Sequence, residues 1–424
     1  MDYPWLIAYL VLAGAAVVQS LLVALQAWEH RRHGRSCLRN LDRFQTTGRC
    51  CVLVPCKGSE ADLEENLRAV MHQDYHDYEV TFIVQTADDP ACEAIRRVMA
   101  DGGQVASRLL VAGRATSSGQ KVHNLLAATA KIPSEIAFLA FLDSDSHPRP
   151  EWLRLAIARL DPQQPQATTG YRWFVPRRAT LANYLLTSIN CSLMALSSRR
   201  TRGLVWGGSW AIRREAFEQI GLREAWQGTL SDDLVASRTL GRRRFFVRFE
   251  PGCVVASPMD YSPREMFSFL RRQYLIARHY VPSWWWFALV NTTIRNLAWL
   301  VSLGLLGSGL MGAGVAAWVP GTVLAVLYGL DIYRGRLIQD LAEPYLGEAS
   351  LGLRGWLRIH LWLGPAAGLV HWLGILSAAV GRSITWRGIH YRLARGGKIA
   401  GISHDGAKPA IGNFLQPQRR RKAA

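Results

Sequence analysis

Apolar and polar positions divide the chain into an apolar N-terminal run, a mixed central region and an apolar C-terminal region. Residues 4–28 are apolar almost throughout and contain no charged side chain. A helix of this length can cross the hydrocarbon core of a bilayer, which is roughly 30 Å thick. A cleaved signal peptide is the alternative, but no basic segment precedes the run, and the run is too long for one. We therefore expect a transmembrane anchor within residues 1–30.

The central region, residues 45–260, alternates short β-rich runs with amphipathic segments. The β-rich runs predict buried parallel strands at 50–55, 78–85 and 136–142. Segments with helical spacing lie between these runs, at 61–73, 90–100 and 121–130. This alternation predicts an open α/β sheet that binds ligands beyond the carboxyl ends of its strands. Neither a Gly-x-Gly-x-x-Gly nor a P-loop pattern occurs, which argues against a dinucleotide site or a Walker NTPase.

The C-terminal region starts with a basic amphipathic segment and then becomes apolar again. Residues 261–283 predict an interfacial basic helix, and residues 284–381 predict C-terminal membrane helices. Trp284, Trp285 and Trp286 stand where this apolar part begins. Because indole rings favour the membrane interface, we expect this cluster to anchor the helix that follows.

The number of C-terminal crossings conflicts with the charge of the segment after them. Apolar runs cover 287–306, 310–328 and 359–380, the first containing Arg295 and the last Pro365. Three crossings would place the arginine-rich residues 382–424 outside, against the preference of basic segments for the cytoplasm. We therefore expect an even number of crossings, with 359–380 lying in the interface or re-entering. Residues 382–424 are then a basic cytoplasmic tail.

Charge indicates the sidedness of the central region and the nature of its partners. The net charge is +18 although 49% of the residues are hydrophobic, and 16 are tryptophan. The arginines cluster beside apolar runs, which favours anionic lipid over nucleic acid. Five of them follow the first run: Arg31, Arg32, Arg35, Arg39 and Arg43. The positive-inside rule then predicts an integral membrane protein with a cytoplasmic central domain, in a bacterial inner membrane or its equivalent.

Acidic pairs follow two of the predicted strands. Asp88 and Asp89 come after the second strand, and Asp143 and Asp145 come directly after the third. Two carboxylates at one strand end can hold Mg²⁺ or Mn²⁺ on a diphosphate, because these hard cations prefer oxygen ligands. Such a cation neutralises the charge that builds on a leaving diphosphate. The alternative is that Asp143 and Asp145 cap a helix that starts near Pro150.

A third acidic pair, Asp232 and Asp233, precedes another amphipathic segment. In the functional interpretation, one carboxylate is a general base that takes the proton of an acceptor hydroxyl during an inverting displacement. In the structural interpretation, Ser231 caps a helix and the two carboxylates stabilise its first turn. Each acidic pair is ambiguous by itself, and the order and spacing of all three are more specific.

Together these motifs resemble the ceramide glucosyltransferase family, a group within the inverting GT-A glycosyltransferases. That family has a proline–lysine–glycine segment, a YEV…VQ…DDPA stretch, a K…NNL segment, three aspartate regions and an acceptor-side glycine segment. The matching residues here are 54–58, 78–91, Lys121 with Asn124-Leu125, Asp143, Asp233, and Trp206-Gly207-Gly208-Ser209 with Arg213. The resemblance extends to Trp386-Arg387-Gly388 and Tyr391-Arg392 near the C-terminus.

The resemblance implies an α/β GT-A domain with transmembrane and interfacial helices, a UDP-glucose donor and a ceramide acceptor. The donor-binding residues that it implies are Pro55, Lys57, Asp88, Asp89, Lys121 and Asp143. Asp143 and Asp145 would hold Mg²⁺ or Mn²⁺, and Asp233, beside Asp232, would deprotonate the primary hydroxyl of the lipid. Gly207, Gly208 and Ser209 would lie on the acceptor side. For Lys57 and Lys121 the alternative is a solvated side chain without a ligand.

One family motif, R/Q-x-x-R-W, is altered in this chain. The corresponding stretch places Gln273 at the arginine position and Tyr274 at the tryptophan position. We expect both residues at the donor site, with the charge of the motif supplied by Arg271, Arg272 or Arg278. The alternative is a basic amphipathic helix resting on anionic lipid, and the two roles are compatible.

Other functions remain open at the level of the sequence. The same residues would serve a hopanoid or diacylglycerol acceptor, with N-acetylglucosamine or galactose as the sugar. A processive polysaccharide synthase also joins such a domain to membrane helices, but normally has more crossings and an intact R/Q-x-x-R-W motif. A non-catalytic membrane protein that binds nucleotide sugars would be expected to lose its acidic clusters. No pattern indicates an oligomeric state.

Overall fold

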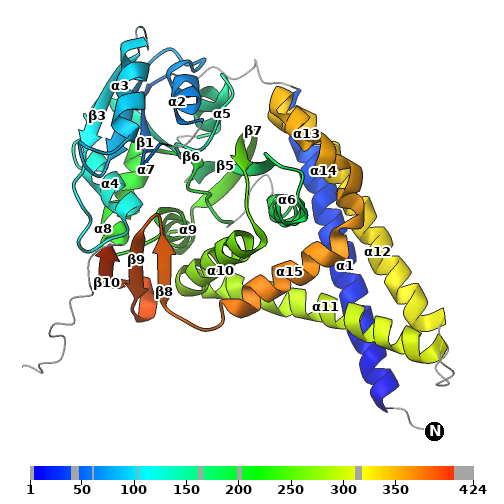
Figure 1. Ribbon diagram of the computed structural model, residues 1–424. Coiled ribbons are helices and arrows are strands. Elements are labelled where there is room, and N and C mark those ends of the chain that lie inside the picture. Colours follow the sequence, from blue (N-terminus) through cyan, green and yellow to red (C-terminus); the bar gives the residue numbers. More distant parts are fainter. Residues whose placement is uncertain are drawn as a thin grey trace, which may run out of the picture.

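A computed structural model describes residues 4–39, 47–59, 62–101, 103, 105–160, 166–197, 203–310 and 318–404. An α/β domain lies beside a group of long helices (Figure 1). The strands are β1 (Arg49–Pro55), β2 (Tyr78–Val84), β3 (Ala106–Val111), β4 (Ile136–Leu142), β5 (Gln166–Pro176), β6 (Ser209–Arg213), β7 (Phe246–Met259), β8 (Ser383–Trp386), β9 (Ile389–Leu393) and β10 (Ile399–His404).

The large sheet has the strand order β3-β2-β1-β4-β6-β5-β7. Strands β1 to β4 run parallel to one another, whereas β6 is antiparallel to both of its neighbours, β4 and β5. The central strands are continuous apolar runs because helices cover both of their faces. The three strands expected from the sequence are present, each with boundaries within one residue of those predicted. The predicted α/β fold class is confirmed.

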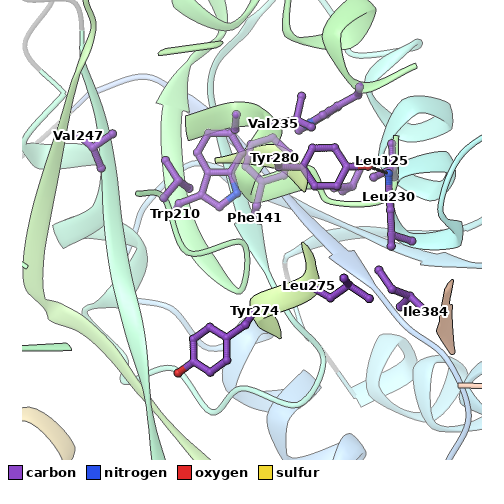
Figure 2. Packing of buried hydrophobic residues seen from close by; sticks show 14 of the residues in the cluster. Leu125, Phe141, Trp210, Leu230, Val235, Val247, Tyr274, Leu275, Tyr280 and Ile384 are labelled. Carbon is purple, nitrogen blue, oxygen red and sulfur yellow. Dashed lines mark hydrogen bonds between the residues drawn. The ribbon is translucent and has the colours of Figure 1, made fainter. Parts of the chain in front are cut away.

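Helices cover the two faces of this sheet and build separate apolar cores. One face is packed by α2 (Leu63–Met71), α3 (Ala91–Asp101) and α5 (Trp152–Ala158). The other is packed by α4 (Gln120–Thr129), α6 (Leu181–Met194), α7 (Arg214–Gln219), α8 (Leu222–Trp226), α9 (Asp232–Arg242) and α10 (Pro263–Tyr280). In this second core Phe141 stacks on Trp210 at a centroid distance of 4.1 Å (Figure 2). Burying side chains of this size stabilises the fold by about 1.5–3 kcal/mol each, so the end of β4 is held firmly.

The long helices form a second region, built by both ends of the chain (Figure 1). They are α1 (Pro4–Leu38), α11 (Pro282–Leu310), α12 (Trp318–Gln339), α13 (Ala342–Leu346), α14 (Arg354–Ile359) and α15 (Gly364–Ser377), with the 3-10 segments η2 (Gly347–Leu353) and η3 (His360–Trp362). Among the described residues, α1 and the segment Pro282–Ser308 are each long and apolar enough to cross a membrane. Trp318–Trp362 and Gly364–Ser377 form a pair bent by 93°, which fits a broken span or a re-entrant segment. Of the crossing expected at 310–328, residues 311–317 lie outside the described residues, and α12 covers 318–328 and continues to Gln339.

The last strands differ from the expected basic tail. Strands β8, β9 and β10 form an antiparallel sheet, with η4 (Arg395–Gly397) before β10. Strand β9 alternates buried and exposed positions, so its apolar side chains face the α/β domain while His390 and Arg392 face outward. An alternation with a period of two is typical of a strand. It was missed in the sequence because the segment is rich in arginine. Residues 405–424, which complete the expected tail, lie outside the described residues.

The small C-terminal sheet is attached to the α/β domain. The Ile399 N–H donates to the carbonyl of Gly228 at 2.8 Å, and the Gln120 N–H donates to the hydroxyl of Tyr391 at 3.2 Å. The chain before α11 and the chain after α15 therefore lie on the same side of any membrane that α11 crosses. This geometry is compatible with the expected even number of crossings between them, which stays a prediction.

Candidate active site

A pocket of about 1200 Å³ connects the α/β domain to the long helices. At one end it is lined by Pro55, the last residue of β1, by Lys57 in the loop that follows, and by Asp143, which follows β4. At the other end it reaches Gln19 of α1 and Asn291 of α11. Ligand sites of open α/β sheets lie beyond the carboxyl ends of the strands, and this pocket starts there. Its volume exceeds that of a typical small-molecule site, about 300–1,000 Å³.

Lys121, in the first turn of α4, links the acidic groups of the site. Its Nζ lies 2.7 Å from Asp143 Oδ1 and 3.1 Å from Asp232 Oδ2, the latter without hydrogen-bond geometry. The same ammonium donates to the carbonyl of Gly207 at 3.2 Å. One buried cation thus joins the end of β4, the start of α9 and the segment before β6.

Gly207 and Gly208 let these carboxylates approach the main chain. A Cβ at position 207 would lie 2.7 Å from Asp232 Oδ2 and 3.1 Å from Lys121 Nζ. A Cβ at position 208 would lie 2.7 Å from Asp143 Oδ2 and 2.2 Å from the ring of Trp206. Only glycine fits at either position without displacing the charged groups.

Asp143 and Asp145 are not helix caps. Helix α5 starts at Trp152, its N-cap position is Glu151, and no side chain caps it. Asp145 lies 3.5 Å from Arg172, and its Oδ1 is buried without a hydrogen-bond partner among the described residues. This orphaned oxygen and the oxygen-only chemistry of the pair fit a divalent cation. In the part of the chain that the structure describes, no three His, Cys, Asp or Glu side chains group to hold a metal, so its other ligands would come from a bound diphosphate and water.

Asp232 and Asp233 lie in the first turn of α9, as the structural interpretation predicts, and they also line the pocket. Ser231 caps α9 by accepting from the Leu234 N–H at 3.2 Å, and both carboxylates lie in the first turn. Asp233 Oδ1 accepts from Ser231 Oγ at 2.5 Å and from the Leu234 N–H at 2.7 Å. Asp233 Oδ2 accepts a longer bond, 3.3 Å, from the Gly207 N–H. Both carboxylates also line the pocket, so capping and a chemical role are compatible.

Burial and charge set the protonation of these groups in opposite directions. Burial, reinforced by the charges of Asp233 and Asp143, raises the pKa of Asp232 to about 7 despite Lys121. Burial also raises the pKa of Asp145. For Asp143, burial is overcome by Lys121, which lies closest to it and lowers its pKa. For Lys121, burial is likewise overcome by the surrounding carboxylates, which raise its pKa.

Some expected site residues lie outside the pocket. Asp88 is exposed, and Asp89 accepts from the main-chain N–H groups of Gly58 at 2.8 Å and Ala91 at 3.0 Å. Asp89 therefore fixes the loop after β1 and the start of α3. Ser209 is fully buried in β6, where its Oγ donates to the carbonyl of Cys253 and accepts from the indole of Trp152.

Some residues of the altered motif on α10 line the pocket, and others lie outside it. Arg272, Gln273 and Tyr274 line the pocket. Arg271 donates instead to the carbonyl of Val380 at 3.1 Å, and Arg278 donates to main-chain carbonyls just after α15, those of residues 379 and 381. These two arginines stabilise the end of α15, because cations favour the carbonyl end of a helix.

Four pocket residues were not expected from the sequence: Arg172, Trp206, Arg387 and His371. The guanidinium of Arg172 lies over the ring of Phe174 at 4.8 Å and near that of Trp206 at 5.7 Å. Trp206 adjoins the glycine segment, which was a usable signal. Arg387 belongs to the Trp386-Arg387-Gly388 segment of the family resemblance, which was a second signal. For Arg172 and His371 the sequence held none, because their neighbours in space are distant along the chain.

The chain is similar to known glycosyltransferases. Residues 10–399 match Glycosyl transferase family 21. The chain is 19% identical to ceramide glucosyltransferase 1 of Caenorhabditis elegans over 358 residues, covering 82% of this chain and 72% of that relative. It is 27% identical to ceramide glucosyltransferase 3 of the same organism over 77 residues, covering 18% of this chain and only 17% of that relative. A mannosyltransferase from Pyrobaculum calidifontis, solved with GDP-mannose and Mn²⁺, superposes with a TM-score of 0.47 at 17% identity, covering 85% of this chain and 99% of that one. The chain belongs to glycosyltransferase family 21 and is a glycosyltransferase.

Proposed function

We propose that the protein transfers glucose from UDP-glucose to the primary hydroxyl of ceramide, with inversion, at the cytoplasmic face of a membrane. The observation that carries this proposal is the pocket, which joins the carboxylates after β4 to α1, α11 and α15. In such a pocket a soluble sugar donor and the head of a membrane lipid meet while the lipid tails remain in the bilayer. The two relatives are both ceramide glucosyltransferases, which supports this donor and this acceptor.

The donor would occupy the sheet end of the pocket. Asp143 and Asp145 would hold Mg²⁺ or Mn²⁺, whose charge, when bound, stabilises the leaving diphosphate. Lys57 lines this end and would contact a phosphate. Asp88, which is exposed, would contact the nucleotide, and Asp89 would position the loop after β1 by holding Gly58.

Asp233 would act as the general base. Two hydrogen bonds to its Oδ1 fix the orientation of the carboxylate. Its Oδ2, with only a long bond from Gly207, is the oxygen more available to a hydroxyl proton. Once deprotonated, the lipid oxygen attacks the anomeric carbon from the face opposite the diphosphate, which inverts the configuration. Asp232 shares Lys121 with Asp143 and so maintains the charge balance around the base.

The acceptor head would lie between Asp233 and the long helices. Tyr274 of α10 and His371 of α15 stack with a centroid distance of 5.4 Å. The hydroxyl of Tyr274 and Nε2 of His371 are buried without hydrogen-bond partners among the described residues. In Figure 2 the Tyr274 hydroxyl points away from the packed apolar cluster. Hydroxyl and amide groups of a sphingolipid head would satisfy both atoms.

The assignment of substrates is tested by reconstitution. The protein in nanodiscs is incubated with radiolabelled UDP-glucose, Mn²⁺ and either ceramide, diacylglycerol or a hopanoid, and products are identified by mass spectrometry. Glucosylceramide as the main product supports the proposal. Transfer to another lipid overturns the acceptor, and a polymer overturns the single-transfer reaction. UDP binding without any transfer contradicts the reaction itself.

The base assignment is tested by Asp233→Asn. Losing a general base lowers the transfer rate by about 10²–10⁴-fold, while UDP–Mn²⁺ binding, measured by isothermal titration calorimetry, is expected to persist. Asp101→Asn, at an exposed ion pair with Arg68 remote from the pocket, is the control that should leave both unchanged. Full turnover by Asp233→Asn would sink the assignment.

A further inference from the structure

The small C-terminal sheet brings a tight turn to the donor end of the pocket. Strands β8 and β9 pair so that Trp386 faces Ile389, leaving Arg387-Gly388 as a two-residue connection. Both connecting residues have positive φ, 48° for Arg387 and 74° for Gly388. A two-residue hairpin of this kind requires that conformation, which suits glycine but is unfavourable for arginine. Strained backbone of this sort concentrates at binding sites.

The turn is clamped to the loop after β1. The guanidinium of Arg387 donates to the carbonyl of Lys57 at 2.8 Å, and the ammonium of Lys57 donates to the carbonyl of Arg387 at 3.1 Å. These two bonds join residues that are 330 positions apart. Both residues line the same end of the pocket as Asp143 and Asp145.

Three arginines from three separate elements converge beside the carboxylate pair. They are Arg172 of β5, Arg272 of α10 and Arg387 of the turn, and each lines the pocket. Burial and then the neighbouring charges of Arg172 and Arg387 lower the pKa of Arg272. The charges of the same two arginines favour the ionised forms of Asp143 and Asp145. Guanidinium groups gathered in this way form forked, charge-assisted hydrogen bonds to phosphate oxygens.

We infer that Arg387 is a donor-binding residue, and that the C-terminal turn closes the donor site by placing its guanidinium on the diphosphate of the nucleotide sugar. Arg172 on β5 and Arg272 on α10 supply the other contacts to the phosphates. This assignment rests on the proposed function insofar as the donor is a nucleoside diphosphate sugar. It also explains how the site tolerates Gln273 where the family motif has arginine, although Arg271 and Arg278 are directed at the end of α15.

The test compares UDP with UMP, which lacks the β-phosphate. Binding of each to the full-length protein in nanodiscs is measured by isothermal titration calorimetry with Mn²⁺ present. We expect Arg387→Gln to weaken UDP binding by about 10- to 100-fold, the usual loss for a charge-assisted bond, while UMP affinity changes far less. Arg387→Lys should give an intermediate UDP affinity, because it keeps the charge but not the fork. Arg392→Gln, on the outward face of β9, is the matched control and should bind both nucleotides normally.

Each outcome decides a separate question. Unchanged UDP affinity in Arg387→Gln overturns the inference while leaving the proposed function intact. Equal loss of UDP and UMP affinity also overturns it, because that result indicates that the turn only supports the fold. Failure of the unmodified protein to bind UDP contradicts the proposed function itself. If Arg387→Gln does not fold, as judged by thermal unfolding, Arg387→Lys and Arg172→Gln carry the same UDP-to-UMP comparison.

Discussion

Two acidic pairs occupy equivalent positions in the sheet but differ in what surrounds them. Strands β2 and β4 both run parallel to β1 on either side of it, and Asp88-Asp89 and Asp143/Asp145 follow their carboxyl ends. Helix α3 starts only two residues after Asp89, so that carboxylate turns back onto main-chain N–H groups. After Asp145 the chain runs through residues 146–151 before α5 starts, and both carboxylates line the pocket. The distance to the next helix thus decides whether a carboxylate at a strand end serves the backbone or faces a ligand.

The largest difference between the pairs should appear in catalysis. Asp143→Asn removes a half-buried charge that faces Lys121 and the expected cation, so transfer should fall by about 100-fold or more. Asp88→Asn, at an exposed position, should cost only a small factor. Radiolabelled transfer rates in nanodiscs measure both. Equal losses in the two variants would contradict the distinction drawn from burial.

A second difference concerns pH, because burial shifts the carboxylates of the pocket. The pKa of Asp232 is about 7 in the folded protein and near 3.8 in the unfolded chain. Because the pKa of Asp232 is higher in the folded protein, its protonation contributes to folding stability. This contribution is fully present below the unfolded pKa and is lost as the pH rises through the folded pKa of about 7. We expect the apparent Tm of the unmodified protein to fall relative to Asp232→Asn between about pH 4 and pH 7, and the difference to level off above. Parallel Tm curves for the two proteins across this window would refute the assignment.

The smallest effect is expected for Asp89, which holds main-chain N–H groups on both sides. Asp89→Ala removes the acceptor for the Gly58 and Ala91 N–H groups, and losses of this kind cost about 1 kcal/mol of folding stability. Thermal unfolding measures the loss, with Asp74→Asn as a control at an exposed ion pair with Arg154. A drop in transfer without any drop in Tm would show that Asp89 touches the donor directly rather than positioning the loop after β1.

Much of the architecture followed from local patterns. The strand after residue 48 and the strand ending at Leu142 were expected almost to the residue, because continuous apolar runs between polar turns have one compact solution in an α/β sheet. The C-terminal sheet was not expected, because its strands are only four to six residues long and β9 alternates His390 and Arg392 with apolar residues, a weak signal beside the overall basic charge. The bent pair around α15 fits the expectation that the last apolar run does not simply cross the membrane.

For the three acidic pairs, the sequence and the tertiary structure determine different properties. The sequence by itself determined the reaction class, because carboxylate pairs at the ends of apolar strands, in family order, are local features that survive without a structure. Only the tertiary structure decided which of those carboxylates line the pocket and which, like Asp89, hold main-chain N–H groups outside it. It also brought Arg172 and Arg387 to the same site, from positions more than 200 residues apart. The physical reason is that hydrogen bonding and hydrophobic periodicity act over a few residues, whereas a charged site is built by whatever elements the packed cores hold side by side.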